Sequence, residues 1–78
     1  MRVTRITANP DILGGKPIIR GTRITVQLIL DLLAAGETTE TILRDHYPHL
    51  APEDVQACLE YAAKLSANEI HIDLDRTA

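Results

Sequence analysis

The clearest pattern in the chain is a stripe of hydrophobic residues at helical spacing within residues 26–35. Its members occupy positions i, i+3, i+4 and i+7, namely Val26, Ile29, Leu30 and Leu33. This spacing places them on one face of a helix. Thr25 precedes the stripe as an N-cap, and Gly36 follows it with the freedom to adopt the left-handed conformation that ends a helix. The pattern predicts a helix of about 10 residues.

A second, shorter helix is predicted after Thr38. Thr38 is a suitable N-cap, and Glu40 lies in the first turn, where the helix dipole favours an acid. Ile42 and Leu43 would face inward. Pro48 ends the helix, since proline cannot donate the next backbone hydrogen bond.

The third predicted helix begins at Pro52, which suits the first helical position. Acids follow at positions 53 and 54, but Ala51 is a poor cap. The predicted buried face consists of Val55, Cys58, Leu59, Ala62 and Leu65. The predicted exposed positions are Glu53, Asp54, Gln56, Glu60 and Lys64.

Extended segments are predicted at both ends of the chain. Val3 and Ile6 alternate with polar residues in residues 1–7, which is typical of a short edge strand, and residues 18–20 and 23–24 are brief extended pieces between glycine and proline turns. Residues 69–75 alternate strictly, with apolar side chains at 70, 72 and 74, so they form a strand or a tail that becomes one on a partner.

These elements predict a mostly helical single domain over residues 1–78. We expect an extended, glycine- and proline-rich basic segment in residues 1–24, a three-helix core in residues 25–66, and a C-terminal strand or tail in residues 67–78. The second and third helices have the lengths of a helix-turn-helix pair.

Charge divides the chain into two unequal parts, although the total is only −3. Residues 1–23 carry a net charge of +4 and residues 31–75 a net charge of −8, counting Lys, Arg, Asp and Glu. A basic contact surface near the N-terminus of an acidic body is one interpretation, and scattered solvated charges are the other.

Composition limits the compartment and the assembly. The single cysteine excludes an intramolecular disulfide, residues 1–20 lack a signal peptide, and the apolar run in residues 26–35 is too short to cross a membrane. We therefore expect a cytoplasmic protein. With only two aromatic residues the core is built from aliphatic side chains, so we expect a homodimer or a higher oligomer to add stability.

The segment from Gly14 to Arg23 first resembles a phosphate-binding loop. A Walker motif requires G-x-x-x-x-G-K-[ST], whereas here Gly14, Gly15 and Lys16 come first and Pro17 follows without an N–H to donate. A compact turn explains the glycines, but a tight turn does not require two arginines.

No catalytic or metal centre is predicted, and we expect neither an enzyme nor a cofactor. Pro48 separates His46 from His49, so with Asp45 they do not form a four-ligand set. Cys58 lies on an apolar helix face, where a thiol is usually a small core hydrophobe. No nucleophile and base can be paired.

The third predicted helix is too acidic to read DNA. Its exposed side carries three acids against Lys64, and these would repel the phosphates that supply most of the affinity for DNA. If the domain binds nucleic acid, the N-terminal cations Arg2, Arg5 and Lys16 are better candidates.

Three separated motifs resemble the domain-of-unknown-function 433 family. They are Asn9-Pro10 with Gly14-Gly15-Lys16-Pro17-Ile18-Ile19-Arg20-Gly21-Thr22-Arg23-Ile24, then Leu33-Ala34-Ala35-Gly36, then Asp45-His46-Tyr47-Pro48-His49-Leu50. The resemblance covers roughly residues 5 to 65. Ala51 departs from the family, which often has Thr or Ser before the third helix.

The resemblance implies a homeodomain-like or winged-helix-like fold and an antitoxin role, with a PIN-like nuclease toxin as the partner. By matching positions, Gly14, Gly15, Pro17 and Gly21 shape the motif. Lys16, Arg20, Thr22 and Arg23 are its candidate partner-binding residues.

Arg20 and Arg23 could occupy the carboxylate cluster of such a nuclease through bidentate hydrogen bonds. Residues 69–75 could add a strand to the partner's sheet. The alternatives are a small dimeric DNA-binding regulator without a toxin, and a purely structural dimerisation module.

Overall fold

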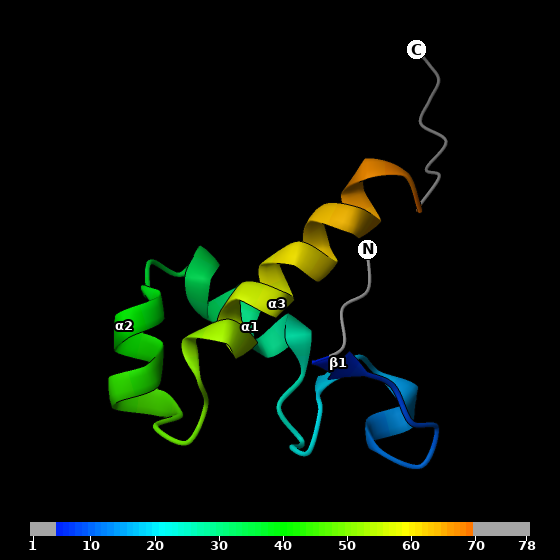
Figure 1. Cartoon of the computed structure of the whole chain (residues 1–78), viewed down its shortest axis with the longest axis horizontal. Helices are drawn as coiled ribbons and strands as arrows, with labels where there is room; N and C mark the ends of the chain where they lie inside the picture. The colour runs from blue at the N-terminus through cyan, green and yellow to red at the C-terminus, as the bar shows by residue number, and fades with distance from the viewer. Residues whose placement is uncertain (1–4, 70–78) are drawn as a thin grey trace.

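The structure, a computed structural model, describes residues 5–69 and consists of three helices with a two-stranded sheet (Figure 1). The elements are β1 (Ile6–Thr7), η1 (Leu13–Gly15), β2 (Ile18–Ile19), α1 (Val26–Ala34), α2 (Thr39–Thr41), η2 (Ile42–His46), α3 (Pro52–Lys64) and η3 (Leu65–Glu69). The predicted mostly helical class is confirmed. Arg2 and nearly all of the alternating segment in residues 69–75 lie outside the described residues.

Helix α1 has the predicted capping residues at both ends. The Thr25 hydroxyl accepts a hydrogen bond from the Leu28 backbone N–H at 3.0 Å, which satisfies a donor that has no partner inside the helix. Gly36 has φ of 102°, a left-handed conformation that glycine adopts without a Cβ clash. The predicted helix is therefore confirmed.

Helix α2 begins with a reciprocal cap and continues directly into η2. The Thr38 hydroxyl accepts from the Thr41 backbone N–H at 3.1 Å, and the Thr41 hydroxyl accepts from the Thr38 N–H at 2.9 Å. The helical turns then widen, so that the Tyr47 N–H donates to the Ile42 carbonyl at 2.8 Å. The predicted second helix is confirmed over residues 39–46, and it ends before Pro48.

Helix α3 starts at Pro52 as predicted, but two of the predicted side-chain environments are wrong. Asp54, predicted as exposed, is 8% exposed, and Leu59, predicted as buried, is 41% exposed. The inward face consists of Asp54, Val55, Ala57 and Cys58, with Asp54, Ala57 and Cys58 at positions i, i+3 and i+4. Leu59 lies at the outer edge of that face, beyond Val55, so it is open to solvent.

The N-terminal segment completes the hydrophobic core. Strands β1 and β2 pair antiparallel with Ile6 opposite Ile19, and the Arg20 N–H donates to the Arg5 carbonyl at 2.7 Å. Ile6, Ile19 and Ile24 pack in the same cluster as the buried residues of the helices. Residues 1–24 were predicted as a segment separate from the helical core, but Ile6, Ile19 and Ile24 are part of that core.

The sheet and α2 lie at opposite ends of the longest axis of the molecule (Figure 1). Helices α1 and α3 pack against each other between them. None of the helices within residues 5–69 has the length and hydropathy needed to cross a bilayer.

Candidate partner-binding site

The glycine-rich segment folds as two successive turns rather than one loop. In the first turn, Leu13, Gly14 and Gly15 all have positive φ, at 50°, 67° and 85°. The chain then extends through Lys16 and Pro17, and the Pro17 carbonyl accepts from the Val26 N–H at 3.0 Å. The first turn therefore places Pro17 next to the start of α1.

The second turn is held by hydrogen bonds that converge on Thr22. Its backbone N–H and its hydroxyl donate to the Ile19 carbonyl at 3.0 and 2.8 Å, and the hydroxyl accepts from the Ile24 N–H at 2.9 Å. Gly21 has φ of 82°, which an L side chain adopts only with strain. Thr22, predicted as a partner-binding residue, uses its hydroxyl to fix the turn on which Arg20 and Arg23 are placed.

Arg20 and Arg23 are exposed and line one groove, which we call the arginine groove. Its volume is about 600 Å³. Its lining residues are Thr7, Ala8, Asn9, Pro10, Ile12, Ile18, Arg20, Gly21, Thr22 and Arg23. None of these lining residues is acidic, and several present apolar atoms. The groove therefore suits a ligand that carries both carboxylates and apolar groups.

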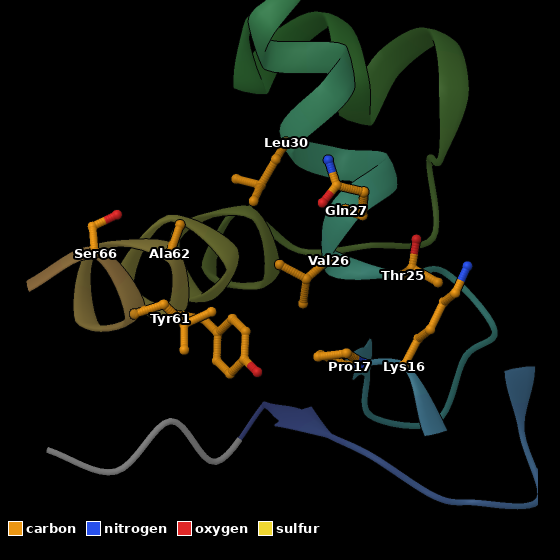
Figure 2. Close-up of a pocket in the computed structure, with 10 residues that line it drawn as sticks. Lys16, Pro17, Thr25, Val26, Gln27, Leu30, Tyr61, Ala62 and Ser66 are labelled. Atoms are coloured by element: carbon orange, nitrogen blue, oxygen red, sulfur yellow. The ribbon is translucent and has the colours of Figure 1, made fainter. Parts of the chain in front are cut away.

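Lys16 and Pro17 line a different depression, the tyrosine groove, between the start of α1 and the end of α3 (Figure 2). Its volume is about 520 Å³, and its lining residues are Lys16, Pro17, Thr25, Val26, Gln27, Leu30, Tyr61, Ala62, Leu65 and Ser66. Figure 2 shows Pro17, Val26 and the Tyr61 ring gathered around one part of it. The structure thus separates Lys16 from the groove that Arg20, Thr22 and Arg23 share.

Arg5, a candidate for nucleic-acid binding, has an internal partner. Its Nη1 donates to Asp54 Oδ1 at 2.9 Å, and its side chain remains 47% exposed. Asp54 Oδ2 also accepts from the Ala51 N–H at 2.9 Å. The carboxylate at the third position of α3 therefore supplies one half of a capping box, because it satisfies the Ala51 N–H, while Ala51 has no side-chain acceptor for the other half. An acid two residues after a helix-starting proline was the sequence signal for this role.

Within residues 5–69, His46 and Asp45 have separate partners, and Cys58 is buried in the core. His46 Nε2 lies 3.6 Å from Glu37 Oε2, and Asp45 pairs instead with Arg44, whose hydrogen bond lowers the pKa of the Asp45 carboxyl. Burial, with a smaller contribution from the charge of Asp54, raises the pKa of the Cys58 thiol to about 11. No group of three His, Cys, Asp or Glu residues that could hold a metal occurs in this part of the chain.

The fold and the site together define a class of protein. It is a small helical domain that presents two exposed arginines on a hydrogen-bonded turn. The chain belongs to the family described as "Protein of unknown function (DUF433)", whose model matches residues 6–62. The family resemblance of the sequence motifs is thereby confirmed.

Two relatives support this assignment. "Uncharacterized protein y4eO" of Sinorhizobium fredii (strain NBRC 101917 / NGR234) is 40% identical over 57 residues, which are 73% of this chain and 25% of that protein. This chain therefore spans about a quarter of the relative's length. The crystal structure of a DUF433 member protein from Anabaena variabilis has a TM-score of 0.72 and 32% sequence identity, over 77% of this chain and 58% of that one.

Proposed function

We propose that this domain is an antitoxin that neutralises a PIN-like nuclease by protein–protein binding and does not itself catalyse a reaction. The role comes from the family resemblance. The observation that supports it is the arginine groove, where Arg20 and Arg23 are exposed on a turn fixed by Thr22. A fixed turn lowers the conformational entropy lost when the arginines bind.

The chemistry of such an interaction follows from the guanidinium group. Arginine remains charged at any physiological pH and forms paired hydrogen bonds with a carboxylate. A nuclease that holds its metal ions with carboxylates offers such acceptors. Insertion of Arg20 or Arg23 among them would occupy the metal-binding positions and stop cleavage.

The test is inhibition of a purified PIN-like nuclease, chosen from a reading frame next to this chain if one is found there, with and without the two arginines. We expect Arg20→Ala with Arg23→Ala to raise the concentration needed for half-inhibition by at least about tenfold. The matched control removes two cations elsewhere, Arg44→Ala with Lys64→Ala, and should inhibit normally. Unchanged inhibition by the Arg20 and Arg23 double variant would contradict the proposal.

DNA binding for self-repression is a separate component, and α3 is a poor surface for it. Its solvent side includes Glu53 and Gln56, and the cation Arg5 is paired with Asp54. A regulator that uses the N-terminal cations would lose affinity steeply between about 50 and 200 mM salt, in proportion to the phosphates contacted. Titration of the upstream DNA over that range separates such a regulator from an antitoxin that binds protein alone.

A further inference from the structure

We propose that the arginine groove also binds residues 70–75 of a second copy of this chain. The groove combines the two exposed cations Arg20 and Arg23 with apolar atoms of Pro10 and Ile12. Leu13, which follows Ile12, is 43% exposed and extends the apolar surface of that loop. A complementary ligand therefore carries acidic and apolar groups on a short stretch of chain.

The sequence Ile70-His-Ile-Asp-Leu-Asp75, which follows η3, has this composition. When such a segment is extended, alternate side chains point to opposite faces. His71, Asp73 and Asp75 would then share one face, while the aliphatic residues at 70, 72 and 74 share the other. Acidic and apolar faces on one extended segment match the arginines and the apolar atoms of the groove.

A nucleic acid fits the same groove less well. Its phosphates would satisfy the arginines, but the sugar–phosphate backbone offers little apolar surface for Pro10 and Ile12. An alternating acidic and aliphatic peptide satisfies both kinds of lining group. Charge and apolarity together favour the peptide.

The second copy is favoured over the same chain because exchange is reciprocal. In a symmetric dimer each copy supplies one groove and one segment, so the same contact forms twice. The wild-type chain is then a dimer, whereas a segment bound to its own groove would leave it a monomer.

This inference does not rest on the antitoxin proposal, although the two share Arg20 and Arg23. The exchanged segment would cover the arginines until a partner with more carboxylates displaced it. Asp73→Asn with Asp75→Asn should therefore weaken the dimer whether or not the chain inhibits a nuclease. A failed nuclease assay would leave the dimer measurement unaffected.

The experiment measures the dimer dissociation constant of the full chain by sedimentation at low salt. We expect both Arg20→Gln with Arg23→Gln and Asp73→Asn with Asp75→Asn to raise it by at least about tenfold. Two controls make the same charge changes elsewhere: Arg44→Gln with Lys64→Gln, and Asp31→Asn with Glu40→Gln. Circular dichroism of every variant verifies that the helices are formed.

Mixing the two weakened variants then tests which surfaces meet. The groove variant retains its acidic segment and the segment variant retains its groove, so one intact contact can form and a heterodimer should appear. A wild-type chain that stays monomeric, a dimer unaffected by Asp73→Asn with Asp75→Asn, or the absence of a heterodimer on mixing would each overturn the proposal.

Discussion

Arg5 Nη1 and Asp54 Oδ1 lie 2.9 Å apart and join the residue before β1 to the first turn of α3. The second oxygen of Asp54 caps the same helix through the Ala51 N–H. One carboxylate thus connects the N-terminal segment to the helical core and starts α3. Within residues 5–69, every buried side-chain polar atom has a hydrogen-bond partner. The burial of Asp54 therefore leaves no carboxylate oxygen without a hydrogen bond.

Asp54→Ala should lower the free energy of unfolding by about 2–3 kcal/mol, because it removes the cap and leaves Arg5 without its partner. Arg5→Ala should cost less, about 1 kcal/mol, since its side chain is half exposed. Urea unfolding followed by circular dichroism measures both. Asp45→Asn, in the exposed pair with Arg44, is the control and should change stability by less than about 0.5 kcal/mol. Equal effects at positions 45 and 54 would refute this assignment.

Thr22→Val keeps the shape of the side chain and removes its hydroxyl. The Ile24 N–H then loses its acceptor and the Ile19 carbonyl loses one of its donors, so we expect a loss of about 1–2 kcal/mol in the free energy of unfolding. Thr22→Ser retains the hydroxyl and should lose much less. If both variants unfold at the wild-type urea concentration, the hydroxyl does not hold the turn.

Gly21→Ala should destabilise the domain by about 1 kcal/mol. An added Cβ would meet no atom within 4 Å, so the cost comes from the φ of 82° alone. Gly21→Asn should cost less, because asparagine tolerates the left-handed region better than alanine. Thermal unfolding of the two variants beside wild type gives the ranking, and an alanine variant as stable as wild type would exclude strain at this position.

Cys58 should be almost unreactive in the folded protein. Its pKa is raised from 9.0 to about 11, so its thiolate fraction near neutral pH is about a hundredfold below that of an unperturbed thiol. We expect slow modification by a thiol reagent at pH 8 and complete modification in urea. Rapid modification of the folded chain would mean that the thiol is accessible.

The same shift predicts a dependence of stability on pH. Above about pH 9 the unfolded thiol loses its proton while the folded thiol retains it, so the free energy of unfolding should fall as pH rises from 9 to 11. Subtracting the profile of Cys58→Ala isolates the contribution of Cys58 from that of the tyrosines. Identical profiles for the two proteins would contradict the shift.

The three helices could be predicted because their signals are local. Thr25 and Thr38 cap α1 and α2 through hydrogen bonds in their first turns, Gly36 ends α1 through its left-handed φ, and the fixed φ of Pro52 suits the start of α3. The environment of Asp54 could not be predicted in this way. Its charge and its place in the first turn are typical of an exposed acid. Asp54 is buried instead, because it pairs with Arg5, which lies 49 positions away in the sequence.

The sequence alone determined the family, the helices and the position of the two turns, since glycine, proline and capping residues act on their immediate neighbours. Only the tertiary structure decided that the cations of the segment from Gly14 to Arg23 line two different grooves. It placed Lys16 in the tyrosine groove, beside the end of α3, and Arg20 and Arg23 in the arginine groove, beside the loop after β1. The physical reason is the pairing of β1 with β2, a contact between distant segments that no local preference encodes.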